Sequence, residues 1–247
     1  MRVLLLGGTA EARTLAAAVR ERGGIEVMSS LAGRVSNPSL PVGAVRIGGF
    51  GGVDGLAGYL RRERVDAVID ATHPFAATIS AHAAQAAAAA GLPLLVLRRP
   101  GWLESTGDRW IRVPDVAAAA RAVAALPDGC VFLTTGRRDL AVFAADGGHG
   151  YLVRAVDPPM DPLPPAMTLL LARGPYTVDG ETALLRDHDV TALVTKDSGG
   201  GMTSAKLTAA RARALPVVMV DRPPLPPDVR AVPTVADATA WLDSAAG

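Results

Sequence analysis

Short runs of apolar residues alternate along this chain with longer segments rich in alanine and arginine. Strands buried on both faces of a parallel sheet read as continuous apolar runs, so the pattern predicts an α/β fold of βα units. The first half has predicted strands at Val3–Leu6, Ile25–Ser29, Ala44–Ile47, Ala67–Asp70 and Leu94–Leu97, and predicted helices at Glu11–Arg22, Val53–Arg62 and Ala76–Ala90. The second half repeats the scheme, with strands at Val131–Thr134, Tyr151–Ala155, Thr168–Ala172, Ala192–Thr195 and Val217–Val220, and helices at Asp139–Ala145, Gly180–Asp187 and Thr203–Ala214.

The two halves also match in the order of their motifs. A strand and polar turn open each half, at residues 4–11 and 132–139, and Arg-Pro follows each fifth strand. Each half closes with Val-Pro-x-Val-Ala, at 113–117 and 232–236, where we expect the proline in the first turn of a helix. This repetition predicts two tandem Rossmann-like domains, 1–127 and 128–247, each a mainly parallel sheet flanked by helices. The alternative is one continuous doubly wound sheet.

Composition places the chain among ordinary globular proteins, with 49% hydrophobic and 20% charged residues. The formal net charge of +1 gives no reason to expect a nucleic-acid partner. Because Cys130 is the single cysteine, an intrachain disulfide is excluded. The apolar run at the N-terminus is too short for a signal peptide and no later stretch resembles a membrane span, so we expect a cytoplasmic protein.

Arginine is far commoner than lysine. Only Lys196 and Lys206 are lysines among the 25 basic residues. Coding by a G+C-rich genome would produce this bias without any function. Recognition of carboxylates or phosphates would produce it too, because a guanidinium pairs with planar anions through two hydrogen bonds.

The turns after the first and second strands suggest a dinucleotide site. After the first strand, Gly7-Gly8-Thr9-Ala10-Glu11 can bring backbone N–H groups to an anion at a helix start, although the Gly-x-Gly-x-x-Gly spacing is missing. After the second strand, Ser29-Ser30-Leu31-Ala32-Gly33-Arg34 offers hydroxyls and an arginine where an NAD site usually has an acid. We therefore predict NADPH as the cofactor, contacted by Gly8, Thr9, Ala10, Glu11, Ser30, Ala32, Gly33, Arg34 and Thr72, with Ser30 and Arg34 on the 2′-phosphate.

Further polar residues follow the fourth strand of the first half and three strands of the second. Thr72 and His73 lie in Asp70–Ala76, where they can face the nicotinamide or a substrate. In the second half, hydroxyls, glycines and basic side chains follow three predicted strands, and they form a plausible cradle for a substrate with several carboxylates: Thr135, Gly136, Arg137, Arg173, Lys196, Ser198 and Gly199. Phosphate binding at Ser198–Gly200 is the alternative. The histidines show no metal-ligand spacing, so we expect no metal site.

Five of these motifs, in this order, resemble those of precorrin-6A reductases: Gly7-Gly-Thr-x-Glu-Ala12, Ser30–Arg34, Asp70–Ala76, Thr135–Arg137 and Thr195–Gly200. The resemblance covers essentially the whole chain. It implies two Rossmann-like domains with NADPH and the active site in the cleft between them. It also implies hydride delivery to a double bond of precorrin-6A, or of its cobalt form, to give precorrin-6B in cobalamin biosynthesis. A third glycine, Gly201, extends the last motif beyond the pattern of the family.

The resemblance implies a cofactor site at Gly8, Thr9, Ser30, Gly33 and Arg34 and a substrate site lined by Thr72, His73, Arg137 and Lys196. His73, Lys196 or solvent would supply the proton that accompanies the hydride. A tetrapyrrole is then the expected small-molecule partner, together with transient contacts to neighbouring enzymes of the pathway.

Three other functions compete with this interpretation. A short-chain dehydrogenase needs a Tyr-x-x-x-Lys pair, but Met202 stands where Lys206 would require the tyrosine. A nucleotide-sugar transferase with two Rossmann-like halves would bind a nucleotide sugar in place of NADPH. A regulator without catalytic activity would bind NADP without turning it over. A thermal-shift screen would identify the transferase, which binds a nucleotide sugar and not NADPH. A turnover assay would identify the regulator, which binds NADP without consuming it.

Overall fold

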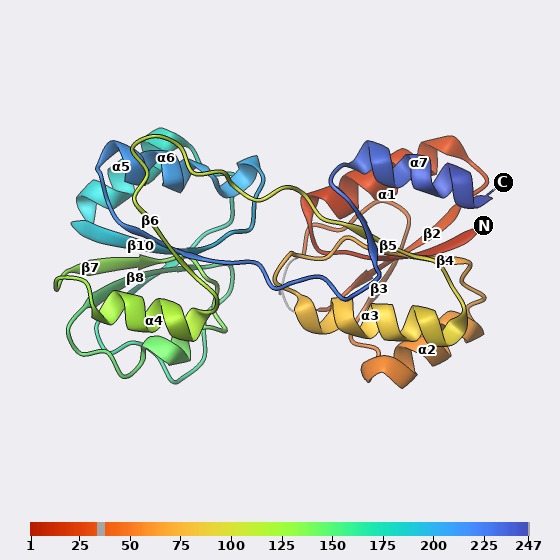
Figure 1. The fold of residues 1–247 in the computed structure, drawn as a ribbon, viewed down its shortest axis with the longest axis horizontal. Helices are drawn as coiled ribbons and strands as arrows, with labels where there is room; N and C mark the ends of the chain where they lie inside the picture. Colours follow the sequence, from red (N-terminus) through yellow and green to blue (C-terminus); the bar gives the residue numbers. More distant parts are fainter. Residues whose placement is uncertain (34–37, 247) are drawn as a thin grey trace. The chain divides into compact units, whose positions relative to one another are not determined.

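The computed structural model describes residues 1–33 and 38–246 and divides the chain into two compact units. Unit 1 comprises residues 1–100 and 223–247, and unit 2 comprises residues 101–222. Each unit is a parallel six-stranded sheet with helices on both faces, which confirms the predicted α/β class with two Rossmann-like halves (Figure 1). No helix within the described ranges is both long and apolar enough to cross a membrane.

The sheet of unit 1 has the strand order β12-β5-β4-β1-β2-β3. Its strands are β1 (Arg2–Leu6), β2 (Glu26–Leu31), β3 (Ala44–Ile47), β4 (Ala67–Asp70), β5 (Leu94–Leu97) and β12 (Arg230–Val232). Helices α1 (Ala10–Arg22) and α7 (Val235–Ala246) cover one face, and α2 (Gly52–Arg62) and α3 (Ala77–Ala90) cover the other (Figure 1). Successive side chains of β1 point to opposite faces, so Leu4 packs under α2 and α3 while Leu5 packs under α1 and α7.

The sheet of unit 2 has the equivalent order β6-β11-β10-β7-β8-β9. Its strands are β6 (Trp110–Val113), β7 (Cys130–Leu133), β8 (Gly150–Ala155), β9 (Met167–Leu171), β10 (Val190–Lys196) and β11 (Val217–Val220). Its helices are α4 (Val116–Ala124), η1 (Leu140–Phe143), α5 (Val178–Asp187), η2 (Gly201–Thr203) and α6 (Ala205–Ala212). Helices α5 and α6 lie on one face and α4 lies on the other (Figure 1).

The closing βα segments are exchanged between the units. The segment β6–α4 follows β5 in the sequence but pairs with β11, and β12–α7 follows β11 but pairs with β5. The two units therefore differ from the expected domains 1–127 and 128–247. The repeated motif shows that the two closing segments occupy equivalent places in the two halves. It does not show which sheet each segment joins. Within unit 1 the departing and returning chains lie together, since the Arg98 guanidinium donates to the Pro223 carbonyl at 2.9 Å.

Local differences from the predicted elements have simple causes. The strands β6 and β12 were not predicted, because they are short and carry mostly exposed residues. The predicted helix Asp139–Ala145 is only a short 3-10 turn, η1. Pro114 and Pro233 lie before the N-cap residues Asp115 and Thr234, so the expected first-turn position was wrong. Both caps accept a backbone N–H through a side-chain oxygen, which fixes the helix start after the proline.

Candidate active site

The loops expected to bind the cofactor meet at the carboxyl edge of the unit 1 sheet. Leu6 at the end of β1 is in register with Ser30 of β2 and with Asp70 of β4. The residues that follow these strands are therefore neighbours. The chain leaves β1 toward β2 and β3 on one side, whereas β4 and β5 lie on the other. Such a switch point is where open α/β sheets bind ligands.

The glycine turn leaves open space above the start of α1. The Gly7 N–H donates to the Ser30 carbonyl at 2.9 Å, which joins the turn to β2. Gly8 has φ +113°, and a Cβ built on it meets no atom within 4 Å. Thr9 caps α1 by accepting from the Ala12 N–H at 3.1 Å, and its hydroxyl donates to the Ala71 carbonyl at 2.7 Å. Because that proton is already used, Thr9 offers an anion its backbone N–H.

The acid in the first turn of α1 is paired with an arginine. Glu11 lies 2.8 Å from the Arg99 guanidinium, which follows β5. Both side chains are largely shielded from solvent. The negative charge of Glu11 is thus compensated by Arg99, so Glu11 does not by itself repel an anion from the helix start.

The end of β2 carries no acid. Ser30 is buried, and its hydroxyl accepts from the Arg46 guanidinium of β3 at 2.7 Å. Ala32 is exposed, whereas Gly33 has φ +69°, and a Cβ built on it would lie 3.0 Å from an Ile47 side-chain carbon. The predicted contact Arg34 lies outside the described residues. Our sequence reasoning missed Arg46; the arginine in a predicted strand ahead of Gly48-Gly49 was the available signal.

The loop after β4 is held by a buried carboxylate. Asp70 accepts from the Thr72 N–H at 3.0 Å, from the Thr72 hydroxyl at 2.6 Å and from the Ser80 hydroxyl at 2.5 Å. The Thr72 hydroxyl therefore orients the loop. His73 is exposed, and its Nδ1 accepts from the Phe75 N–H at 3.3 Å. That bond assigns the proton of the neutral imidazole to Nε2.

The carboxyl edge of the unit 2 sheet gathers most of the predicted substrate residues. Strands β7 and β10 are neighbours, so Thr135 and Gly136 lie next to the loop that begins after Lys196. The Thr135 hydroxyl is buried and has no hydrogen-bond partner among the described residues. The Lys196 ammonium pairs with Asp139. Ser198 and Gly199 continue this loop and are buried.

The remaining two arginines of the predicted substrate set lie toward one end of the sheet. Arg137 donates to the Pro158 carbonyl at 3.3 Å and lies 3.9 Å from Asp157, so it turns to the loop after β8. Arg173 is exposed and follows β9, which is separated from β7 by β8. Only part of the predicted substrate set therefore lies on neighbouring loops. Arg173 lies at the edge of the set.

A buried aspartate that our sequence reasoning missed fixes the glycine loop after β10. The Asp197 carboxylate accepts from the Trp102 N–H at 2.9 Å and from Arg112 at 3.0 Å, and its carbonyl accepts from Arg222 at 2.6 Å. Gly101 allows this approach, since its Cβ would lie 2.8 Å from the carboxylate. An acid next to Lys196 in the Lys-Asp-Ser-Gly sequence was the available signal.

A second charged cluster lies deeper in unit 2. Arg154 forms a bidentate pair with Glu181, at 2.5 and 3.0 Å, and stacks on Tyr176. The Lys206 ammonium is buried nearby, donates to the Thr203 carbonyl at 3.0 Å and lies 5.0 Å from the Trp102 ring centre. Burial, reinforced by the charge of Arg154, lowers the pKa of Lys206 to about 7.

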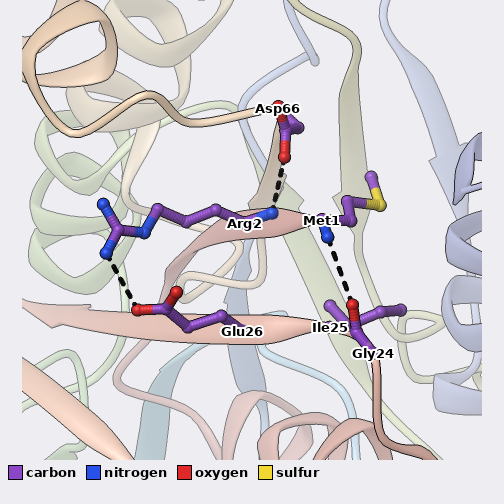
Figure 2. Close-up of a pocket in the computed structure, with 6 residues that line it drawn as sticks. All are labelled: Met1, Arg2, Gly24, Ile25, Glu26 and Asp66. Carbon is purple, nitrogen blue, oxygen red and sulfur yellow. Dashed lines mark hydrogen bonds and ion pairs between the residues drawn. The ribbon is translucent and has the colours of Figure 1, made fainter.

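The pocket drawn in Figure 2 lies at the opposite edge of the unit 1 sheet. It is lined by Met1, Arg2, Gly24, Ile25, Glu26 and Asp66, at and next to the amino ends of β1, β2 and β4. Its polar groups pair with one another (Figure 2). The Arg2 guanidinium forms an ion pair with Glu26 at 3.0 Å, and the backbone N–H of Arg2 donates to the Asp66 carboxylate at 2.6 Å. This pocket is therefore separate from the loops described above.

The donor set fits a dinucleotide and gives no sign of a metal centre. Open space above Gly8, the helix start at Thr9 and the acid-free end of β2 suit a phosphorylated nucleotide. In the part of the chain that the structure describes, no three His, Cys, Asp or Glu side chains gather closely enough to hold a metal ion.

Comparisons with known proteins identify the family to which this chain is similar. The family model described as precorrin-6x reductase CbiJ/CobK matches residues 2–243. A precorrin-6A reductase of Rhodococcus erythropolis is 56% identical over 98% of this chain and 97% of its own length. One of Mycobacterium tuberculosis (strain CDC 1551 / Oshkosh) is 54% identical over the same shares. A solved structure described as CobK precorrin-6A reductase superposes with a TM-score of 0.91 at 47% identity, covering 99% of this chain and 97% of that one.

Proposed function

Because the chain belongs to the precorrin-6x reductase CbiJ/CobK family of cobalamin biosynthesis, we propose that it uses NADPH to reduce one double bond of precorrin-6A, giving precorrin-6B. The family is one of oxidoreductases that act on a carbon–carbon double bond of a precorrin macrocycle, and a nicotinamide cofactor follows from that chemistry. NADPH as the particular cofactor, precorrin-6B as the particular product and the site residues are our proposals.

One observation carries the choice of NADPH. The open turn at Gly8 lies beside the end of β2, and β2 ends without an acid. Its one acidic residue, Glu26, lies at the amino end, where Arg2 pairs with it. An acid at the carboxyl end would accept hydrogen bonds from the ribose hydroxyls of NADH and repel a 2′-phosphate. We assign Gly8, Thr9, Ala10 and Glu11 to the phosphate-binding turn, and Ser30, Ala32, Gly33 and Arg34 to the ribose end.

The loops of unit 2 supply groups that suit a substrate with many carboxylates. In unit 2 we assign substrate binding to Thr135, Gly136, Arg137, Arg173, Lys196, Ser198 and Gly199. In unit 1 we assign Thr72 to the cofactor and His73 to the substrate. The unpartnered Thr135 hydroxyl supports this assignment, because a buried polar group without a partner is costly unless a ligand or water completes it. The guanidinium groups can bind carboxylates through two hydrogen bonds.

The reaction transfers a hydride to one carbon of the double bond and a proton to the other, and NADPH becomes NADP⁺. When bound, the nicotinamide supplies the hydride, so the protein must hold the two reactants close together and exclude water. We propose that either His73 or Lys196 supplies the proton. His73 presents Nε2–H from an exposed loop, and Lys196 is held by Asp139.

The test follows the nicotinamide and macrocycle absorbances together under anaerobic conditions. We expect NADPH to be consumed only when precorrin-6A is present, at a rate that rises with enzyme concentration, and the macrocycle spectrum to change in step. NADH should react more slowly at equal concentration. If NADPH is not consumed while precorrin-6A and folded protein are present, the proposed reaction is wrong. Equal rates with NADH would overturn the choice of cofactor alone.

A further inference from the structure

Arg46 lies where the ribose end of a bound dinucleotide is expected. It belongs to β3, and its register partner is Ser30, in the last part of β2. The two side chains are joined by the hydrogen bond from Arg46 Nη1 to Ser30 Oγ, at 2.7 Å. The backbone then continues into Gly48, whose N–H donates to the Leu31 carbonyl at 2.8 Å. Arg46 is thus tied to the same sheet edge as the proposed cofactor loops.

The guanidinium of Arg46 is held in one orientation before any ligand binds. Its Nη1 also donates to the Gly48 carbonyl at 3.1 Å, and its Nη2 donates to the Gly49 carbonyl at 3.0 Å. Its plane is fixed by the Phe50 ring, whose centre lies 3.9 Å from the guanidinium carbon. Phe50 is itself packed edge-on against Tyr59 of α2. A cation fixed in this way loses little conformational freedom on binding an anion.

The charge of Arg46 is not balanced by a carboxylate. Its partners are three neutral oxygens and an aromatic ring, and among residues 1–33 and 38–246 no carboxylate oxygen lies within 4.0 Å of it. Arg99 and Arg154 differ in this respect, since Arg99 pairs with Glu11 and Arg154 pairs with Glu181. A half-buried cation without a counter-ion is stabilised by a bound anion.

We propose that Arg46, held by Ser30 and Phe50, binds the 2′-phosphate of NADPH and thereby determines the preference for NADPH over NADH. The inference rests on the proposed cofactor. Three of the five guanidinium N–H groups bond protein oxygens, which leaves Nε–H and one Nη2–H for the phosphate. The Ser30 hydroxyl accepts from Arg46, so its own proton can be donated to the same phosphate.

The test measures fragment binding by calorimetry, which is independent of turnover. The ligands are 2′,5′-ADP, which carries the 2′-phosphate, and 5′-AMP, which lacks it. We expect Arg46→Ala to weaken 2′,5′-ADP about 10- to 100-fold, the range for a lost charge-assisted hydrogen bond, and to change 5′-AMP binding less than about twofold. Arg46→Lys keeps the charge but not the guanidinium geometry, so it should give an intermediate loss.

Arg62→Ala is the matched control. Arg62 is also an arginine near Tyr59, 5.6 Å from the ring centre, but it is exposed and lies beside Glu63. Its removal should leave the affinities for both fragments within about twofold of wild type. Ser30→Ala should weaken 2′,5′-ADP selectively and provides a second test if Arg46→Ala does not fold.

Each outcome separates the two proposals. If wild-type protein binds neither NADPH nor 2′,5′-ADP, the proposed cofactor is wrong and the role of Arg46 falls with it. If wild type prefers 2′,5′-ADP and the Arg46 and Ser30 variants keep that preference, only the role of Arg46 is wrong. Equal weakening of both fragments would mean that Arg46 supports the loop and does not recognise the 2′-phosphate.

Discussion

Lys206 shows at the scale of one residue how burial changes the chemistry of a charged group. Its ammonium lies among Arg154 of β8, Glu181 of α5, the Thr203 carbonyl and the Trp102 ring. Glu181 is already engaged by Arg154 through two hydrogen bonds. Burial of the ammonium is the main reason why the pKa of Lys206 falls to about 7 in the folded protein, and the nearby charge of Arg154 lowers it further.

This pKa predicts a pH-dependent stability. Between pH 7 and the ordinary lysine pKa of 10.5, the unfolded chain binds a proton at Lys206 that the folded chain does not. Stability from this group therefore rises with pH across that window, and it levels off below about pH 7, where both states bind the proton. Relative to Lys206→Met, the free energy of unfolding of wild type should rise from pH 7 to pH 9, with a slope that reaches about 1.4 kcal/mol per pH unit above pH 8.

Denaturant titrations at constant ionic strength measure that difference. Arg211→Met is the control, because Arg211 lies on the same helix, pairs with Asp108 and keeps its charge throughout this range. Its difference from wild type should not vary with pH. If the free energies of unfolding of wild type and Lys206→Met differ by the same amount from pH 7 to pH 9, the lowered pKa of Lys206 is contradicted.

Several residues of the candidate site could be predicted from sequence because glycine turns and polar residues follow apolar strands. Gly8, Thr9 and Thr72 were predicted in this way. Arg46 and Asp197 were not, since their importance depends on partners that are distant in sequence, such as Phe50 stacked on Arg46 and Trp102 bonded to Asp197. A pattern of residues along one chain does not reveal which charges lack a counter-ion.

At the scale of elements, the cap of α1 links helix stability to the proposed cofactor turn. We expect Thr9→Ala to lower the free energy of unfolding by about 1–2 kcal/mol, because the side chain both accepts from Ala12 and donates to Ala71. It should also raise the dissociation constant of NADPH several-fold, since the helix start is no longer tied to Ala71, the residue after β4. Chemical denaturation and calorimetry measure the two effects.

Thr177→Ala provides the comparison. Thr177 caps α5 in unit 2 by accepting from the Gly180 N–H at 3.2 Å. Its loss should destabilise the protein by about 1 kcal/mol and leave NADPH affinity unchanged. If the two variants weaken NADPH to the same extent, the turn at Thr9 is not part of the cofactor site.

The regular elements of both units follow from the apolar periodicity, and most predicted strands agree with the structure to within one or two residues. Strands β6 and β12 escape detection for a physical reason. They join the outer edges of their sheets, so they bury little side-chain area and carry no continuous apolar run. Helix α4 and helix α7 could be found because a capping residue and an alanine-rich face follow each proline.

At the scale of the whole molecule, the exchanged closing segments predict which pieces of the chain fold alone. A fragment 1–127 lacks β12–α7, so it exposes the apolar surface that Ala238, Trp241 and Leu242 bury. We expect it to be unfolded or aggregated. Residues 1–100 joined by a short linker to 223–247 keep the complete unit 1 core and should unfold cooperatively.

Circular dichroism during thermal unfolding distinguishes the two pieces. The linked piece should also bind 2′,5′-ADP, because all proposed nucleotide contacts lie in unit 1. The opposite result would be a cooperative transition of fragment 1–127 and failure of the linked piece to fold. It would show that unit 1, as the sheet pairing defines it, is not an independent folding unit.

The central claim is that this protein passes a hydride from NADPH to the double bond of a precorrin. Mass spectrometry of the product formed with NADPH deuterated at C4 of the nicotinamide tests it most directly. With the label on the face from which transfer occurs, the account predicts a product one mass unit heavier than that from unlabelled NADPH in ordinary water. A reduced product that gains no deuterium from either C4 epimer would contradict it.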